Sequence, residues 1–200
     1  ARIITSVLKM IALEFSAKHV LRYLRHDYFL MSQEGDQYAH STDPVQHGMG
    51  WPAIMQQANT SLLVVNRGAH YVEDDIVIAE LNATLNAMRE RYGDSVSIIF
   101  RSTSPGHTDY DSKRYSPPLQ HASEANLTSY TFAKYENQNR LVRALIHKHH
   151  EHVLYLDVYP STILRADGHT TEDGLHYCIP GPIDQWTVFL YNVLNVLEKV

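Results

Sequence analysis

Residues 61–66 read SLLVVN, a short apolar run that ends in a polar residue. Four apolar residues in succession predict a strand buried on both faces of a sheet. Similar runs return as VSIIF at 96–100 and as VLYLDV at 153–158. These three runs decide the fold class, because buried strands of this kind occur in parallel sheets that helices cover on both sides.

Helical patterns separate and follow the three predicted strands. Apolar residues recur at helical spacing over about 73–91, 129–149 and 183–197. The first of these helices begins with acidic residues, which the helix dipole favours at that end. Its apolar stripe consists of Val77, Leu81, Leu85 and Met88. Strands that alternate with helices predict an α/β fold with a mostly parallel sheet.

The segment before the first predicted strand also carries apolar residues at helical spacing. Ile4, Val7, Leu8 and Ile11 follow this period, and we expect a long helix up to about residue 24. A polar loop with several glycines follows. The chain of 200 residues, 44% of them apolar, fits one globular domain over 1–200.

Charge and hydropathy exclude some partners. The formal net charge is -5, and Lys and Arg are scattered along the chain, so no basic face is available to neutralise phosphates. No apolar run reaches the roughly 18 residues that a membrane span needs. We therefore expect no nucleic-acid partner and no membrane contact by this segment; any anchor would lie outside it.

Three Asn-X-Ser/Thr sequons, at Asn59, Asn82 and Asn126, point to a compartment. Such sequons accept N-linked glycans when a eukaryotic chain passes through the secretory pathway. We therefore expect the protein in that pathway, in the Golgi lumen or outside the cell.

Polar residues follow each predicted strand. Asn66 comes after the first, Arg101 after the second, and Asp173 and His176 lie in the loop beyond the third. Ligands of open parallel sheets bind beyond the carboxyl ends of the strands. We therefore expect these residues to converge at one edge of the sheet.

The Asp173-x-x-His176 spacing is that of the base half of a catalytic triad. Residues three apart share one face of a turn or helix, so Asp173 can accept from one ring nitrogen of His176 and leave the other free. The same spacing also suits a capping pair. The nucleophile that such a base would activate must therefore be sought elsewhere.

The block DGLHYCIPGPIDQW at 173–186 resembles the closing block of the PC-esterase branch of the SGNH hydrolase superfamily. That branch includes the plant trichome-birefringence-like polysaccharide O-acetyltransferases and the catalytic domain of sialic acid O-acetyltransferases. Further matches are LLVVNRGAHY at 62–71, RSTSPGH at 101–107, Gln-Asn at 138–139, and the segment 165–169.

The resemblance implies a fold and a chemistry. The fold would be a flavodoxin-like three-layer α/β/α sandwich, and the reaction a serine-dependent O-acetyl transfer or ester hydrolysis on a glycan or polysaccharide hydroxyl. His176 would be the base, Asp173 its orienter, and Asn66 an oxyanion-hole donor. Arg101 and His107 would be substrate-lining. No metal or organic cofactor is implied, and an acetyl donor only for a transferase.

The family's nucleophile belongs to a Gly-Asp-Ser block, and Gly93-Asp94-Ser95 reads this way. We interpret it as a decoy, because it follows a predicted helix and enters a strand, whereas a nucleophile sits where a strand ends and a helix begins. In the family an arginine follows the serine at short spacing, which Arg2 would match. We therefore expect the serine and the first strand upstream of Ala1, and this segment by itself to be inactive.

Other interpretations stay open at this point. The chain could be a non-catalytic glycan-binding or structural domain. The His-rich run at 147–152, or Asp167 and His169 together with the Asp173-x-x-His176 pair, could hold a metal. Trp186 and Tyr177 could stack on a sugar or pack in the core. The single Cys178 has either a partner upstream or a buried thiol.

Overall fold

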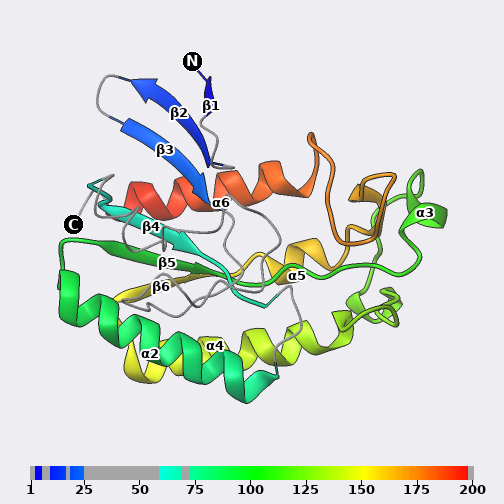
Figure 1. The fold of residues 1–200 in the computed structure, drawn as a ribbon. Helices are drawn as coiled ribbons and strands as arrows, with labels where there is room; N and C mark the ends of the chain where they lie inside the picture. The colour runs from blue at the N-terminus through cyan, green and yellow to red at the C-terminus, as the bar shows by residue number, and fades with distance from the viewer. Residues whose placement is uncertain (1–2, 6–9, 17–18, 25–58, 69–72, 198–200) are drawn as a thin grey trace. The chain divides into compact units, whose positions relative to one another are not determined.

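The computed structural model describes residues 3–5, 10–16, 19–24, 59–68 and 73–197 (Figure 1). Residues 62–78 and 97–200 form one compact unit, here called the main unit, and residues 1–61 and 79–96 form another, here called the second unit. The single domain expected over 1–200 stays a prediction.

The main unit is built on a parallel sheet with strand order β4-β5-β6. The strands are β4 (Leu62–Val65), β5 (Ser97–Arg101) and β6 (Val153–Leu156). Leu63 pairs with Ile98, which in turn pairs with Val153. The three apolar runs are therefore the strands that the sequence predicts, with the predicted parallel direction.

Helices α4 (Tyr135–His149) and α6 (Pro182–Leu197) cover opposite faces of this sheet (Figure 1). On one face, Ile99 and Leu156 belong to a cluster against which the inner side of α6 packs. On the other, Phe100 stacks on Tyr155, whose hydroxyl donates to a backbone carbonyl of α4. Successive side chains along each strand thus point to opposite faces of the sheet. The predicted three-layer α/β/α arrangement is confirmed within the main unit.

Burial of apolar side chains stabilises this arrangement. Ile99, Phe100 and Val158 are fully buried, and each such side chain contributes about 1.5–3 kcal/mol relative to an exposed one. A second cluster joins Phe132, Tyr135, Tyr159 and Ile163. The described residues of the main unit also form five short helices: α3 (Tyr110–Lys113), η2 (Ala122–Glu124), η3 (Phe132–Lys134), α5 (Tyr159–Thr162) and η4 (Ala166–Gly168).

Helix α2 (Asp74–Tyr92) begins in the main unit and continues in the second unit. Its bounds agree with the predicted helix within one residue. Asp74 and Asp75 stand in its first turn and Arg89 and Arg91 in its last, as the helix dipole favours. The predicted apolar stripe is buried: Val77, Leu81, Leu85 and Met88 are each at most 2% exposed.

The helix expected up to about residue 24 is wrong. The second unit has strands β1 (Ile3–Thr5), β2 (Met10–Ser16) and β3 (His19–Leu24) there, joined in an antiparallel sheet. In the segment MIALEFS at 10–16, the large apolar residues Ile11, Leu13 and Phe15 alternate with smaller or polar ones, so the segment satisfies a period of two as well as the helical period. Strand pairing, which residue spacing does not reveal, decides between the two.

Some features of the sequence fall outside the described residues. These are Arg2, the glycine-containing loop within 25–58, and residues 69–71 of the LLVVNRGAHY match. Across the part of the chain that is described, no helix has the length and apolarity to cross a bilayer.

Candidate active site

Hydrogen bonds tie together the loops that leave the three parallel strands. The amide nitrogen of Asn66, after β4, donates to the carbonyl of Arg101 at 2.9 Å and to the hydroxyl of Thr103 at 3.0 Å. The hydroxyl of Ser102, after β5, accepts from the backbone N–H groups of Val158 and Tyr159, after β6. The expected convergence at one edge is therefore present for the strand ends.

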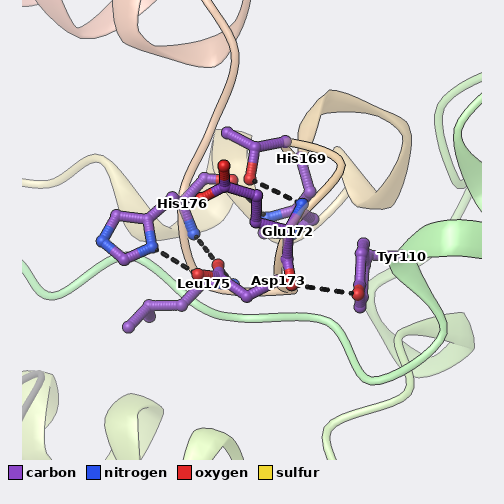
Figure 2. A network of polar contacts seen from close by, with 7 residues as sticks. Tyr110, His169, Glu172, Asp173, Leu175 and His176 are labelled. Carbon is purple, nitrogen blue, oxygen red and sulfur yellow. Dashed lines mark hydrogen bonds and ion pairs between the residues drawn. The ribbon is translucent and has the colours of Figure 1, made fainter.

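The Asp173 to His176 turn is closed by the Asp173 carboxylate. Its Oδ1 accepts from the backbone N–H groups of Leu175 at 2.8 Å and His176 at 2.7 Å, and its Oδ2 lies 2.7 Å from Nδ1 of His176 (Figure 2). The turn therefore caps its own backbone and orients the imidazole with one side chain, so the capping interpretation is confirmed and the triad interpretation stays a prediction.

The imidazole of His176 points outward from this turn (Figure 2). The side chain is 72% exposed, and that of Asp173 is 35% exposed. An ionised carboxylate can only accept, so the neutral imidazole carries its proton on Nδ1 and presents a bare Nε2. This nitrogen is the one that a general base needs.

Competing effects set the pKa of Asp173. Partial burial works to raise it, but hydrogen bonds from the N–H and the imidazole of His176 and from the N–H of Leu175 outweigh burial and hold the pKa below its ordinary value. The carboxylate is therefore ionised at neutral pH and ready to accept a hydrogen bond from Nδ1–H of His176.

The loop that follows β5 holds the Asp173 to His176 turn in place. The backbone N–H of His107 donates to the carbonyl of Gly174 at 2.8 Å. The hydroxyl of Tyr177 donates to the carbonyl of Pro105 at 2.6 Å, and Tyr110 donates to the carbonyl of Glu172 at 3.4 Å. Asp173 and His176 are thereby fixed to the chain that leaves the second parallel strand.

Gly174 permits this close approach. A Cβ built at residue 174 would overlap the backbone carbonyl oxygen of His107, and it would lie 2.9 Å from the ring of Tyr110. The backbone of His107 and the ring of Tyr110 leave no space there, so a residue without a side chain is needed.

Of the other predicted site residues, His107 is buried and Asn66 is already hydrogen-bonded within the protein. His107 is fully buried, and its ring nitrogens contact the carbonyl of Ile163 at 2.9 Å and Nε2 of His169 at 2.7 Å. Its imidazole therefore lies in the interior, where it does not reach a substrate. Both hydrogens of the Asn66 amide nitrogen are donated within the protein, so its oxyanion role stays a prediction.

Arg101 lies beside the core. Its guanidinium is 5.0 Å from the ring of Trp186 and donates to the carbonyl of Ser102. The Trp186 indole donates to the hydroxyl of Thr162 at 2.8 Å and packs with the cluster under α6. The core interpretation of Trp186 therefore fits its contacts.

Ser95 has the context that the sequence predicts for a decoy. It is exposed in the turn between α2 and β5, and its hydroxyl donates to the carbonyl of Tyr92 at 2.6 Å. The residue thus precedes a strand, whereas the site loops follow the strands. Cys178 is exposed, and its thiol donates to the carbonyl of His169 at 3.2 Å, so the expectation of a buried thiol is wrong.

The residue that sequence reasoning missed is His169. It is 3% exposed and contacts both His107 and the carbonyl of His176, whereas the sequence suggests it only within the matching segment 165–169 and as a possible metal ligand. Within the described residues, no group of three or more His, Cys, Asp or Glu side chains is arranged to hold a metal ion.

Comparisons with known proteins bear on this site. The model of the PC-Esterase family, described as the GDSL/SGNH-like acyl-esterase family found in Pmr5 and Cas1p, matches residues 51–193. No curated protein matches the chain. Among solved structures, a GDSL-like lipase from Bacteroides thetaiotaomicron VPI-5482 is similar, with 11% identity and a TM-score of 0.46. That match covers 68% of this chain and 63% of the lipase chain, so the chain spans less than two thirds of its length.

Proposed function

Because the chain belongs to the PC-Esterase family of GDSL/SGNH-like acyl esterases, we propose that it supplies the base half of a serine-dependent acyl-transfer site. The full-length protein is then an O-acetylesterase or O-acetyltransferase that acts on a glycan hydroxyl. His176 is the general base and acid, and Asp173 orients it. The single observation that carries the proposal is the 2.7 Å contact between Asp173 Oδ2 and His176 Nδ1 beneath an exposed ring.

The reaction needs a serine hydroxyl at Nε2 of His176. No serine between 73 and 197, or between 59 and 68, is hydrogen-bonded to this imidazole. We therefore place the nucleophile outside these two ranges. A version of the protein that lacks this serine should be inactive.

The proposed steps follow from which atom holds the proton. As the serine oxygen forms a bond to the acyl carbon, its proton moves to Nε2 of His176, and Asp173 stabilises the imidazolium through Nδ1–H. Collapse of the tetrahedral intermediate breaks the bond to the leaving oxygen, which takes the proton from Nε2. Water or a sugar hydroxyl then repeats the sequence on the acyl-enzyme and releases the serine.

Asn66 is the proposed side-chain donor to the developing oxyanion. Support comes from its place directly after β4, at the edge where the ends of the strands are tied together. To act, the amide would exchange its bond to the Thr103 hydroxyl for one to the oxyanion. Arg101, whose carbonyl accepts from Asn66 at the same edge, is the proposed substrate-lining residue.

The acceptor class and the compartment are part of the proposal. An imidazole that is 72% exposed suits a hydroxyl on a bulky polymer, which an enclosed site would exclude. The sequon at Asn59 is exposed, whereas Thr84 of the Asn82 sequon is 1% exposed within α2. Asn59 and the loop residue Asn126 are therefore the suitable glycan acceptors, in support of a secretory location.

Replacement of the proposed base tests the function. His176→Ala in the full-length protein should lower release of acetate from an acetylated glycan or an aryl acetate by several orders of magnitude. The fold should persist, because the side chain is largely exposed. Ser95→Ala is the matched control and should leave turnover unchanged.

Turnover in His176→Ala comparable with wild type would contradict the assignment of the base. A large loss in Ser95→Ala would show that the Gly-Asp-Ser sequence at 93–95 is the nucleophile block after all. If the wild-type protein itself turns over no acyl ester and no acyl donor, the non-catalytic alternative replaces the proposal.

A further inference from the structure

Two buried histidines lie in a row beneath the Asp173 to His176 turn. His107 Nε2 is 2.9 Å from the carbonyl oxygen of Ile163, His107 Nδ1 is 2.7 Å from His169 Nε2, and His169 Nδ1 is 3.1 Å from the carbonyl oxygen of His176. His107 is 0% and His169 3% exposed. The row therefore runs from the core to the backbone of the proposed base.

A count of protons shows that this row is incomplete when both rings are neutral. Both ends are carbonyl oxygens, which only accept, so each of the three contacts needs a proton from a ring nitrogen. Two neutral imidazoles carry two protons. Three contacts of hydrogen-bond length therefore require one additional proton, shared by His107 and His169.

Without that proton, one contact must bring two lone pairs together. If His107 donates to Ile163 and His169 donates to His107, Nδ1 of His169 faces the His176 carbonyl without a hydrogen. If His169 donates to His176 instead, either the 2.7 Å contact or the contact with Ile163 lacks its hydrogen. A buried pair in this state loses a hydrogen bond and repels at one contact.

Some neighbouring groups lower the pKa of these two histidines, and others raise it. Burial lowers the pKa of His107 and lowers that of His169 to about 4, where the proximity of His107 adds to the effect. The carboxylates of Asp109, Asp167 and Asp173 act against this lowering. Arg165 pairs with Asp167, and the rings of Tyr110 and Tyr177 lie against His169.

We propose that His107 and His169 form one proton-sharing unit that positions the backbone of His176. When the unit holds its extra proton, His169 Nδ1–H donates to the carbonyl of His176, which also accepts from the N–H of Thr170 at 2.9 Å. When the unit is neutral, one link of the row is lost. The unit is a positioning device, and its effect on acyl transfer rests on the proposed function.

Histidine titration by NMR tests the unit without reference to activity. In wild-type protein labelled with ¹⁵N and ¹³C, the ring nitrogens of His107 and His169 and the carbonyl carbon of His176 should change together, with one midpoint on the acid side of neutrality. Separate midpoints for the two rings, or a carbonyl signal that does not follow them, would overturn the proposal.

Two variants distinguish coupled titration of His107 and His169 from independent titration of two buried rings. His107→Gln should move the midpoint of His169 by about one pH unit or more, because the proton-sharing partner is removed. His147→Gln, an exposed histidine on α4, is the matched control and should leave that midpoint unchanged. An unchanged midpoint in His107→Gln would show that the rings titrate independently. The wild-type titration decides the matter should this variant not fold.

Kinetics link the unit to the base. If the full-length protein turns over acyl esters, His169→Gln should lower kcat about 10- to 100-fold with little change in KM, since a displaced base loses alignment but not substrate binding. Unchanged kcat would refute the positioning role. Absence of turnover in wild type would reject the proposed function, while the NMR titration would still decide on the proton-sharing unit.

Discussion

At the scale of single residues, Asp173 does two jobs with one carboxylate. Oδ1 closes the turn by accepting two backbone N–H groups, and Oδ2 orients the imidazole of His176. Local geometry and the tautomer of the base are thereby set by the same side chain. The pair is predictable from sequence because its members are three residues apart and need no tertiary contact to meet.

Asp173→Asn tests both roles. Turnover should fall on the order of 10³- to 10⁴-fold, because an amide no longer enforces the tautomer with a bare Nε2. Since the pKa of Asp173 is lowered in the folded protein, its ionised form stabilises the fold above about pH 4, and this contribution disappears as the pH falls through the lowered pKa.

Chemical unfolding at several pH values measures the stability effect. The difference in unfolding free energy between wild type and Asp173→Asn should be largest near neutrality and shrink in acid. Asp111→Asn, at an exposed carboxylate paired with Arg114, is the control and should change little. A difference that stays constant from neutral to acid pH would contradict the role of the ionised carboxylate.

Not every residue of the site is predictable in this way. His107 and His169 are separated by 62 positions and meet only because the loop after β5 and the segment after η4 pack together. Their spacing carries no signal, and burial of His107 removes it from the substrate-lining role that its sequence context favours. Long-range packing, rather than local pattern, decides such positions.

At the scale of elements, a sequence pattern predicts the structure when it fits a single period and fails when it fits two. The apolar stretches LLVV in β4, IIF in β5 and VLYL in β6 have no polar interruption, and the stripe of α2 has no period of two, so each pattern fits one structure. The segment 10–16 fits two periods, and pairing with its neighbours makes it a strand. Residue propensity alone does not reveal which segments pair as neighbouring strands.

The turn that carries the proposed base depends on a residue without a side chain. Gly174→Ala should push the turn away from the loop after β5, because a Cβ would overlap the carbonyl oxygen of His107. The expected loss of stability is about 1–3 kcal/mol, typical of an inserted methyl group in a packed site. Turnover should fall with it, as the hydrogen bond between His107 and Gly174 is strained.

Gly93→Ala is a useful comparison for this variant. Gly93 has φ +56°, and a Cβ there meets nothing within 4 Å, so its substitution costs backbone strain of about 1–2 kcal/mol without a clash. Thermal unfolding and acyl turnover of both variants distinguish the cases. Equal turnover in Gly174→Ala and Gly93→Ala would show that close packing under the turn does not position His176.

At the scale of the whole molecule, the main unit places residues from distant parts of the chain at one edge of a parallel sheet. Asn66, Ser102 and Val158 mark the ends of its three strands, and the hydrogen bonds between them tie these ends together. The Asp173 to His176 turn is attached to this edge through the loop after β5. Topology therefore explains why the proposed base, His176, is where an α/β fold binds its ligands.

Trapping of the nucleophile tests the central claim that Asp173 and His176 activate a serine. The full-length protein is treated with a fluorophosphonate, which reacts with activated serines, and the modified peptide is mapped by mass spectrometry. We predict one labelled serine, outside residues 59–68 and 73–197, and loss of the label in His176→Ala. Absence of any labelled serine, a label on Ser95, or undiminished labelling in His176→Ala would contradict the account.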